Sequence, residues 1–140
     1  MNYDDCTTAL TDKTIVVEER GKRFIVANLL RKTISKTQVD GCLFDETHEK
    51  CDWIISYENG KVKVALFIEL KGTDLNKAYS QLLATLDLTR VFFLAHTKSF
   101  YIICARVPKA GPKTQVLKKK FLTKTRCNLH IKTLQHIETI

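Results

Sequence analysis

The segment CDWIISYENGKVKVALFIELK, residues 51–71, constrains the fold more than any other part of the chain. Asn59-Gly60 lies between two apolar runs, and Asn-Gly is a strong short-range signal for a tight hairpin turn. In the second run every even position from Val62 to Leu70 is apolar, a period of two that is typical of a strand. The segment therefore predicts two long antiparallel strands joined by a tight turn.

The second strand ends in FIELKG, residues 67–72, which places two charged side chains at the end of an apolar run. Glu69 and Lys71 are two residues apart, so we expect them on one face of the strand, opposite the apolar row. Asp52 lies near the start of the first strand, which a long hairpin brings beside the end of the second. If Asp52 shares that face, two carboxylates and an amine converge. The alternative is a solvated ion pair at a strand end, which contributes little to stability.

Two carboxylates and a lysine form a minimal set of groups for hydrolysing a phosphodiester bond. Carboxylate oxygens bind Mg²⁺ or Mn²⁺, and these ions also bind phosphate oxygens. Such a metal lowers the pKa of a bound water and stabilises the charge that develops on the phosphate group. A lysine beside the metal can orient or deprotonate the attacking water. Convergence of the three side chains would therefore make this chemistry feasible.

A helix is predicted directly after the hairpin. Apolar residues within 75–86 recur with helical spacing, and Thr73 or Asp74 can cap the first turn. We expect the helix to continue to about Leu94. The alternative is that residues 91–96 form another strand.

The remaining segments predict further strands and a second helix. A hairpin turning at Arg20-Gly21 is expected within residues 14–30, with a helix over 22–30 as the alternative. Further strands are expected at residues 39–44, 100–107 and 128–140. A short basic helix is expected within 109–126, and polar connections at 31–38 and 45–50. This order predicts one domain, residues 1–140, of the α/β or α+β class: a small mixed sheet flanked by helices.

Composition indicates a soluble cytoplasmic protein. Hydrophobic residues make up 44% of the chain, enough for a core, yet no apolar run approaches the length of a membrane span. The N-terminus lacks the features of a signal peptide. The five cysteines form no C-x-x-C pair, and their odd number fits a reducing compartment better than a disulfide framework. We interpret Cys42, Cys51 and Cys104 as small core residues, and the four histidines as surface or partly buried residues.

The net charge of +8 favours a polyanionic partner such as nucleic acid or an anionic membrane surface, and of these we expect nucleic acid and no membrane. Residues 109–126 hold seven Lys or Arg residues and no acid, so contact with a phosphate backbone competes with the interpretation as a solvated face. The candidate nucleic-acid-binding residues are Lys113, Lys118, Lys119, Lys120, Lys124 and Arg126. Nothing in the segment is typical of a helix that reads bases, so no sequence specificity is expected.

Asp52, followed seventeen residues later by Glu69-Leu70-Lys71 on a hairpin that leads into a helix, resembles the PD-(D/E)xK nuclease superfamily. The resemblance covers about residues 39–107 and implies a restriction endonuclease-like core. It implies that Asp52 and Glu69 are ligands of Mg²⁺ or Mn²⁺ and that Lys71 is the catalytic lysine. It also implies a role for Gln81, because several members keep a glutamine facing the site from this helix. A solvated helix-edge residue is the alternative for Gln81.

The chain departs from the superfamily pattern at two points. Cys51 stands where the superfamily's name has proline. Many members begin with a helix that carries an additional acid, whereas strands are expected here near the N-terminus. Glu18, Glu19 and Asp40 are the candidates for that acid, and Asp40 is equally suited to form a turn before Gly41.

These observations lead to three hypotheses. The first is a Mg²⁺- or Mn²⁺-dependent endonuclease that acts on DNA rather than RNA, with a homodimer as one arrangement that would set two sites opposite two strands. The second is a catalytically inactive nuclease-fold module that binds nucleic acid or a protein partner. The third is a metal-free protein-interaction domain whose charge serves solubility.

Overall fold

The computed structural model describes residues 2–45, 49–72, 74–106 and 112–140, apart from the side chains of residues 71, 72 and 112. The strands are β1 (Thr7–Leu10), β2 (Thr14–Glu19), β3 (Lys22–Ala27), β4 (Ile34–Gln38), β5 (Trp53–Asn59), β6 (Val62–Gly72), β7 (His96–Cys104), β8 (Asn128–Thr133) and β9 (Gln135–Thr139). The helices are a short 3₁₀ helix η1 (Asp4–Cys6), α1 (Leu75–Leu88) and α2 (Pro112–Thr125). The result is a mixed α+β fold, as the element order predicted.

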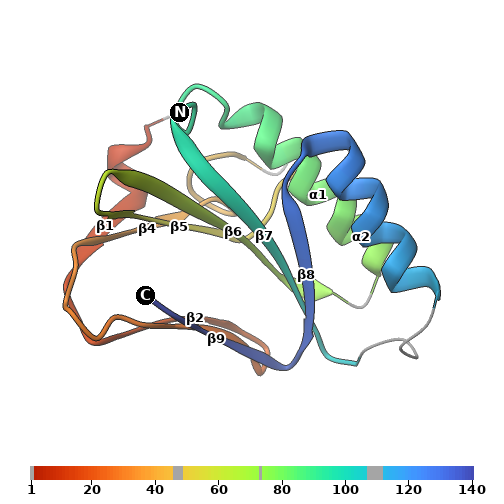
Figure 1. The fold of residues 1–140 in the computed structure, drawn as a ribbon, viewed down its shortest axis with the longest axis horizontal. Coiled ribbons are helices and arrows are strands. Elements are labelled where there is room, and N and C mark those ends of the chain that lie inside the picture. Colours follow the sequence, from red (N-terminus) through yellow and green to blue (C-terminus); the bar gives the residue numbers. More distant parts are fainter. Residues whose placement is uncertain (1, 46–48, 73, 107–111) are drawn as a thin grey trace.

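The strands form two sheets that face each other (Figure 1). The larger has the order β1-β4-β5-β6-β7-β8 and the smaller has the order β2-β3-β9. Neighbours from β1 to β6 in the larger sheet are antiparallel, whereas β6, β7 and β8 are parallel to one another. Helices α1 and α2 make the two parallel connections, as parallel pairing requires a crossover.

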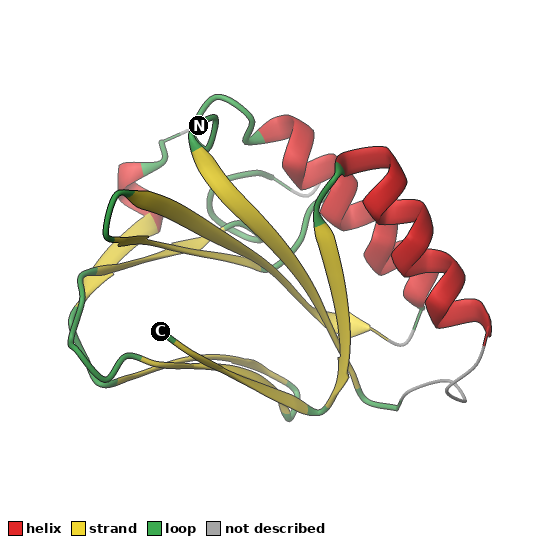
Figure 2. Cartoon of the chain, viewed as in Figure 1, coloured by secondary structure: helices red, strands yellow, loops and turns green. Residues whose placement is uncertain are grey.

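The larger sheet is covered on both faces. Figure 2 shows both helices on one face and the smaller sheet opposite the other. On the helix side, Phe67, Phe100 and Phe121 pack in one buried cluster. On the other side, Phe24 of the smaller sheet packs with Tyr101 of β7. Within the described residues, no helix combines the length and the apolar character needed to cross a membrane.

The predicted hairpin at residues 51–71 is confirmed. β5 pairs with β6 from Trp53 opposite Ile68 to Asn59 opposite Val62, and Gly60 at the turn has φ of 66°, a left-handed conformation that glycine adopts at little cost. Even positions of β6, such as Ile68, pack toward the smaller sheet, and Phe67 packs toward the helices. The apolar row therefore fills the space between the two sheets.

Two expectations for the segment before the hairpin are wrong. Residues 31–38 do not form a polar connection, because β4 lies there and pairs with β1 and β5. Residues 39–44 are not a strand, since the chain turns back and leaves only a bridge between Asp40 and Phe44. The sequence gives no strand signal at β4, because Ile34 is the only strongly apolar residue of this segment. Pairing with β1 on one side and β5 on the other stabilises the strand instead.

Two expected element ends are also wrong. Helix α1 ends at Leu88 rather than near Leu94, because Thr89 leaves the helical conformation, with φ of −104° and ψ of 8°. The N–H groups of Arg90, Phe92 and Phe93 then bond to carbonyls three residues back instead of four. The final segment, residues 128–140, forms two strands in different sheets rather than one. Leu134, with φ of 63°, separates them and marks the change of sheet.

The cysteines are partly as expected. Cys51 and Cys104 are fully buried, as predicted. The expectation for Cys42 is wrong, because this residue is exposed and forms a disulfide with Cys6. The reduced state expected of the cysteines therefore does not hold for this pair, which joins η1 to the turn after β4. The cytoplasmic location stays a prediction.

We expect Asp74→Ala to lower the free energy of unfolding by about 1 kcal/mol. Asp74, one of the two caps that the sequence offered, is the N-cap of α1, and its carboxylate accepts a hydrogen bond from the Lys77 N–H at 3.1 Å. Chemical denaturation measures the change. Asp74→Asn is the matched control, because asparagine caps about as well as aspartate. Equal losses in both variants would contradict the capping role.

Candidate functional site

The two carboxylates that the sequence singled out lie opposite each other at one end of the β5–β6 hairpin. The pairing of Trp53 with Ile68 places Asp52 beside Glu69, and the Asp52 N–H donates to the Ile68 carbonyl at 3.1 Å. Residues directly opposite in an antiparallel pair share one face. Both side chains are buried, with 3% of Asp52 and none of Glu69 exposed. Asp52 and Glu69 therefore lie at neighbouring positions on one face of the hairpin, as the spacing predicted.

Asp52 is held by hydrogen bonds from two neighbouring segments. Its Oδ2 atom accepts from the Leu70 N–H at 2.8 Å, which binds the carboxylate to β6. Its carbonyl accepts from the N–H groups of Val39 and Asp40, at 3.0 and 3.4 Å. The side chain and backbone of Asp52 are therefore both oriented, one by the hairpin and the other by the turn after β4.

A buried threonine, which sequence reasoning missed, connects α1 to this site. The Thr85 hydroxyl accepts from the Cys51 N–H at 2.7 Å and donates to the Gln81 carbonyl at 2.8 Å. Burial raises the pKa of the Cys51 thiol, and the negative charges of Glu69 and Asp52 raise it further. The thiol is thus neutral and unsuited to act as a nucleophile. The sequence signal that could have identified Thr85 is its position, because a polar residue stands there on the helix face that the apolar spacing predicts to be buried.

An acidic hollow of about 290 Å³ opens beside Asp52. Its lining residues come from β2, from β4 and the turn after it, and from the start of β5: Glu18, Glu19, Gln38, Asp40, Asp52 and Trp53. The three acids that the sequence offered as alternatives for an additional ligand therefore meet at one hollow. Glu69 does not line it. Lys50, a further residue missed from the sequence, forms an ion pair with Asp40 at 3.5 Å.

Asp52 and Glu69 are the described residues that could hold a hard cation at this end of the hairpin. Asp52 and Glu69 offer carboxylate oxygens, the ligands that Mg²⁺ and Mn²⁺ prefer. In the part of the chain that the structure describes, no three His, Cys, Asp or Glu side chains are arranged to hold a metal. Mg²⁺ often binds through only one or two carboxylates and completes its shell with waters and substrate phosphates.

The other two predicted site residues are placed only in part. Lys71 belongs to β6, but its side chain lies outside the described residues. The pairing of β6 with β7 shifts register between Glu69 and Gly72, so the strand is irregular at this lysine. Gln81 lies on α1 and is partly exposed. The functional roles expected of both residues stay predictions.

The basic residues of the C-terminal segment gather on α2, as predicted. Buried Leu117 and Phe121 hold this helix, which packs beside β8. Six basic residues lie around them. Lys118 is partly buried, and the exposed ones are Lys113, Lys119, Lys120, Lys124 and Arg126. The Lys120 ammonium sits 5.5 Å from the centre of the Tyr79 ring. This basic face is near the edge of the sheet, two strands away from the β6 end that carries Glu69.

Comparison with known proteins yields no relative. No protein-family model, no curated protein and no solved structure matches the chain.

Proposed function

We propose that this chain is a metal-dependent nuclease of the PD-(D/E)xK superfamily that hydrolyses phosphodiester bonds in DNA. The observation that carries the proposal is the pair of buried carboxylates, Asp52 and Glu69, opposite each other on a hairpin that leads into a helix. The order β4-β5-β6-α1-β7 supports a restriction endonuclease-like core. In it an antiparallel meander is followed by a helix and a parallel strand.

In the proposed mechanism, Asp52 and Glu69 would hold Mg²⁺ or Mn²⁺, and Lys71 would act on the attacking water. The metal, when bound, supplies a water of lowered pKa and offsets negative charge on the phosphate. The Leu70 N–H keeps one Asp52 oxygen fixed, so the carboxylate needs no reorientation when it binds. Lys71 would orient the water or pair with the phosphate. Asp40, Glu18 and Glu19 line the hollow beside Asp52. Their negative charges would repel any polyanion other than the bound substrate from this hollow.

The direct test is cleavage of plasmid, linear DNA and RNA with Mg²⁺, with Mn²⁺ and with EDTA. We expect metal-dependent cutting of DNA and no cutting in EDTA. Lys71→Ala is expected to reduce the rate by roughly 100-fold or more, since general acid–base groups contribute about that much. The proposal fails if no substrate is cut, or if Lys71→Ala cuts as fast as the wild type.

The basic face of α2 is expected to hold the DNA backbone. Neutralising Lys119 and Lys120 together should lower the slope of log affinity against log salt by about two, because each phosphate contact contributes about one. Fluorescence anisotropy with a short duplex, measured in EDTA, follows binding alone. Lys13→Ala is the matched control, because Lys13 is exposed but lies outside α2. An unchanged slope in the double variant would contradict the role of this face.

The second candidate is a module on the same fold that binds nucleic acid or a protein without cutting it. The separation of the basic face from Asp52 and Glu69 favours this alternative. Salt-sensitive binding that involves Lys119 and Lys120, with no cleavage in any metal, would support it over the nuclease.

A further inference from the structure

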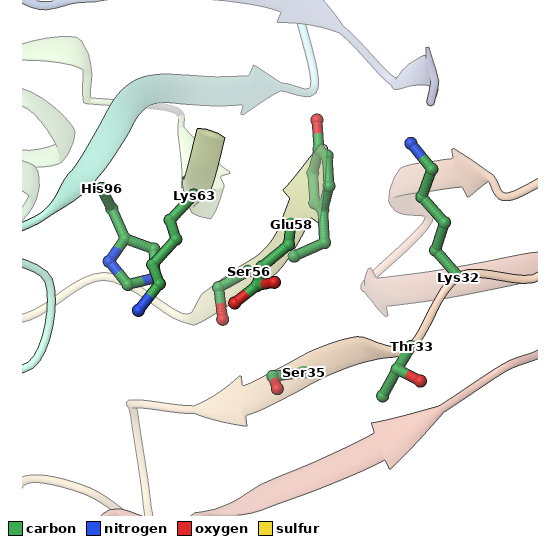
Figure 3. Close-up of a pocket in the computed structure, with 8 residues that line it drawn as sticks. Lys32, Thr33, Ser35, Ser56, Glu58, Lys63 and His96 are labelled. Atoms are coloured by element: carbon green, nitrogen blue, oxygen red, sulfur yellow. The ribbon is translucent and has the colours of Figure 1, made fainter. Parts of the chain in front are cut away.

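A second hollow, of about 530 Å³, lies at the opposite end of the β5–β6 hairpin from Asp52 and Glu69. Its volume falls in the range of small-molecule sites. The lining residues, seven of them labelled in Figure 3, are Lys32, Thr33, Ser35, Ser56, Tyr57, Glu58, Lys63 and His96. The nuclease proposal uses none of these side chains, so their function is a separate question.

Strand register explains why polar side chains gather here. Ser35 lies opposite Ser56, and Glu58 lies opposite Lys63, which in turn neighbours His96 on β7. Directly paired residues share a face, so these five side chains emerge together. Figure 3 shows Lys63 beside His96, with Glu58 and Ser56 between them and Ser35. The helices pack on β6, β7 and β8, which leaves this end of β4 and β5 open.

The charges around the hollow favour an anion. Lys63 forms no ion pair with any other residue that the structure describes, although Glu58 is its strand partner. Burial lowers the pKa of His96, and the positive charges of Lys63 and Lys98 lower it further. Across the hollow, the Lys32 ammonium is held by the Asn59 side chain at 2.9 Å. A bound anion would pair with the Lys63 ammonium, which has no such partner within the described part of the chain, and would favour the protonated form of the neighbouring His96.

The histidine also presents an unmet hydrogen bond. The Nδ1 atom of His96 is buried and has no hydrogen-bond partner among the described residues. A buried polar atom without a partner costs free energy, so this imidazole is poised to turn and bond to a group that enters the hollow it lines. Phosphate oxygens accept bonds from ammonium, imidazole and hydroxyl groups, which Lys63, His96 and the nearby serines supply.

The carboxylate of Glu58 restricts which kind of anion the hollow can bind. A bare inorganic anion would meet this carboxylate and be repelled, whereas a ligand that also carries hydroxyl groups could donate to it. Carboxylates bind ribose hydroxyls in this way in nucleotide sites. We propose that the hollow binds a nucleoside monophosphate or a similar sugar phosphate, with phosphate at Lys63 and His96 and sugar hydroxyls at Glu58. The site is separate from Asp52 and Glu69 and stands whether or not the chain cleaves DNA.

The test is titration of the full chain, in EDTA, with adenosine 5′-monophosphate, ribose 5-phosphate, inorganic phosphate and adenosine. Calorimetry gives the affinities, and NMR of the imidazole signals follows His96. We expect both sugar phosphates to bind and to raise the pKa of His96. Inorganic phosphate is expected to bind more weakly, and adenosine not to bind. Equal affinity for adenosine and its monophosphate would overturn the phosphate assignment.

Variants then assign the contacts. Lys63→Ala and His96→Gln should each weaken ribose 5-phosphate binding about tenfold, the effect of losing a charge-assisted hydrogen bond. Glu58→Gln should weaken ribose 5-phosphate more than inorganic phosphate. Lys61→Ala is the matched control, because Lys61 is exposed at the same hairpin turn and does not line the hollow. Unchanged affinity in Lys63→Ala, or no binding of any phosphorylated probe at millimolar concentration, would overturn the proposal.

Discussion

Glu69→Gln is expected to abolish metal-dependent cleavage, lowering the rate by roughly 1,000-fold or more, while the chain still folds. A catalytic metal contributes several kcal/mol to the transition state, and each 1.4 kcal/mol is about tenfold in rate. Glutamine keeps the shape of this fully buried side chain but lacks the charge that holds a cation. Initial rates on supercoiled plasmid in Mg²⁺ measure the effect, and thermal unfolding verifies the fold.

Asp52→Asn should have the same effect for the same reason. The asparagine amide oxygen can still accept from the Leu70 N–H, which bonds to the Asp52 carboxylate at 2.8 Å, so the local structure is expected to hold. Asp87→Asn is the control, because Asp87 is exposed and its ion pair with Arg90 lies on the surface of the protein. If both Glu69→Gln and Asp52→Asn cut DNA at the wild-type rate, these carboxylates are not the metal site.

Loss of the Cys6–Cys42 disulfide is expected to lower the free energy of unfolding by about 4 kcal/mol, the chain-entropy value for a sequence separation of 36 residues. The double variant Cys6→Ser/Cys42→Ser tests this by guanidinium denaturation. Cys127→Ser is the control, because Cys127 is a free, partly exposed cysteine. A double variant as stable as the wild type would show that the bond does not constrain the unfolded chain.

The disulfide should also affect the candidate active site. Cys42 lies two residues after Asp40, and the N–H groups of Val39 and Asp40 donate to the Asp52 carbonyl. Without the disulfide, hydrogen exchange at these two amides is expected to become faster than in the wild type. Slower cleavage in the double variant under folded conditions would then follow from a less well oriented Asp52. Unchanged exchange at both amides would separate the disulfide from the site.

The hairpin that carries Asp52 and Glu69 is predictable from the sequence because its signals are local. The Asn59-Gly60 turn and the alternation of β6 each depend on residues a few positions apart, and so does the cap of α1 at Asp74. The pairing of one strand start with the other strand end follows once the turn is known. The amino-acid sequence therefore suffices to predict that these two acids meet.

Other parts of the site depend on contacts between distant segments. Thr85 meets Cys51 only because α1 packs over the hairpin, and Glu18 reaches the acidic hollow only because the smaller sheet faces the larger one. The polar hollow near His96 depends in the same way on the register of β6 with β7. No local period or turn signal encodes such contacts, which is also why β4 and the division of residues 128–140 were missed.

Short stretches of sequence specify the central hairpin, the helix after it, the basic face of α2 and the two acids that could hold a metal. All of these follow from side-chain periodicity, turn chemistry and charge among residues close together in the chain. Tertiary contacts alone establish that Cys42 joins Cys6, that four acids share one hollow, and that Lys63 and His96 meet across β6 and β7. These features escape the sequence because burial and pairing between remote segments outweigh weak local preferences.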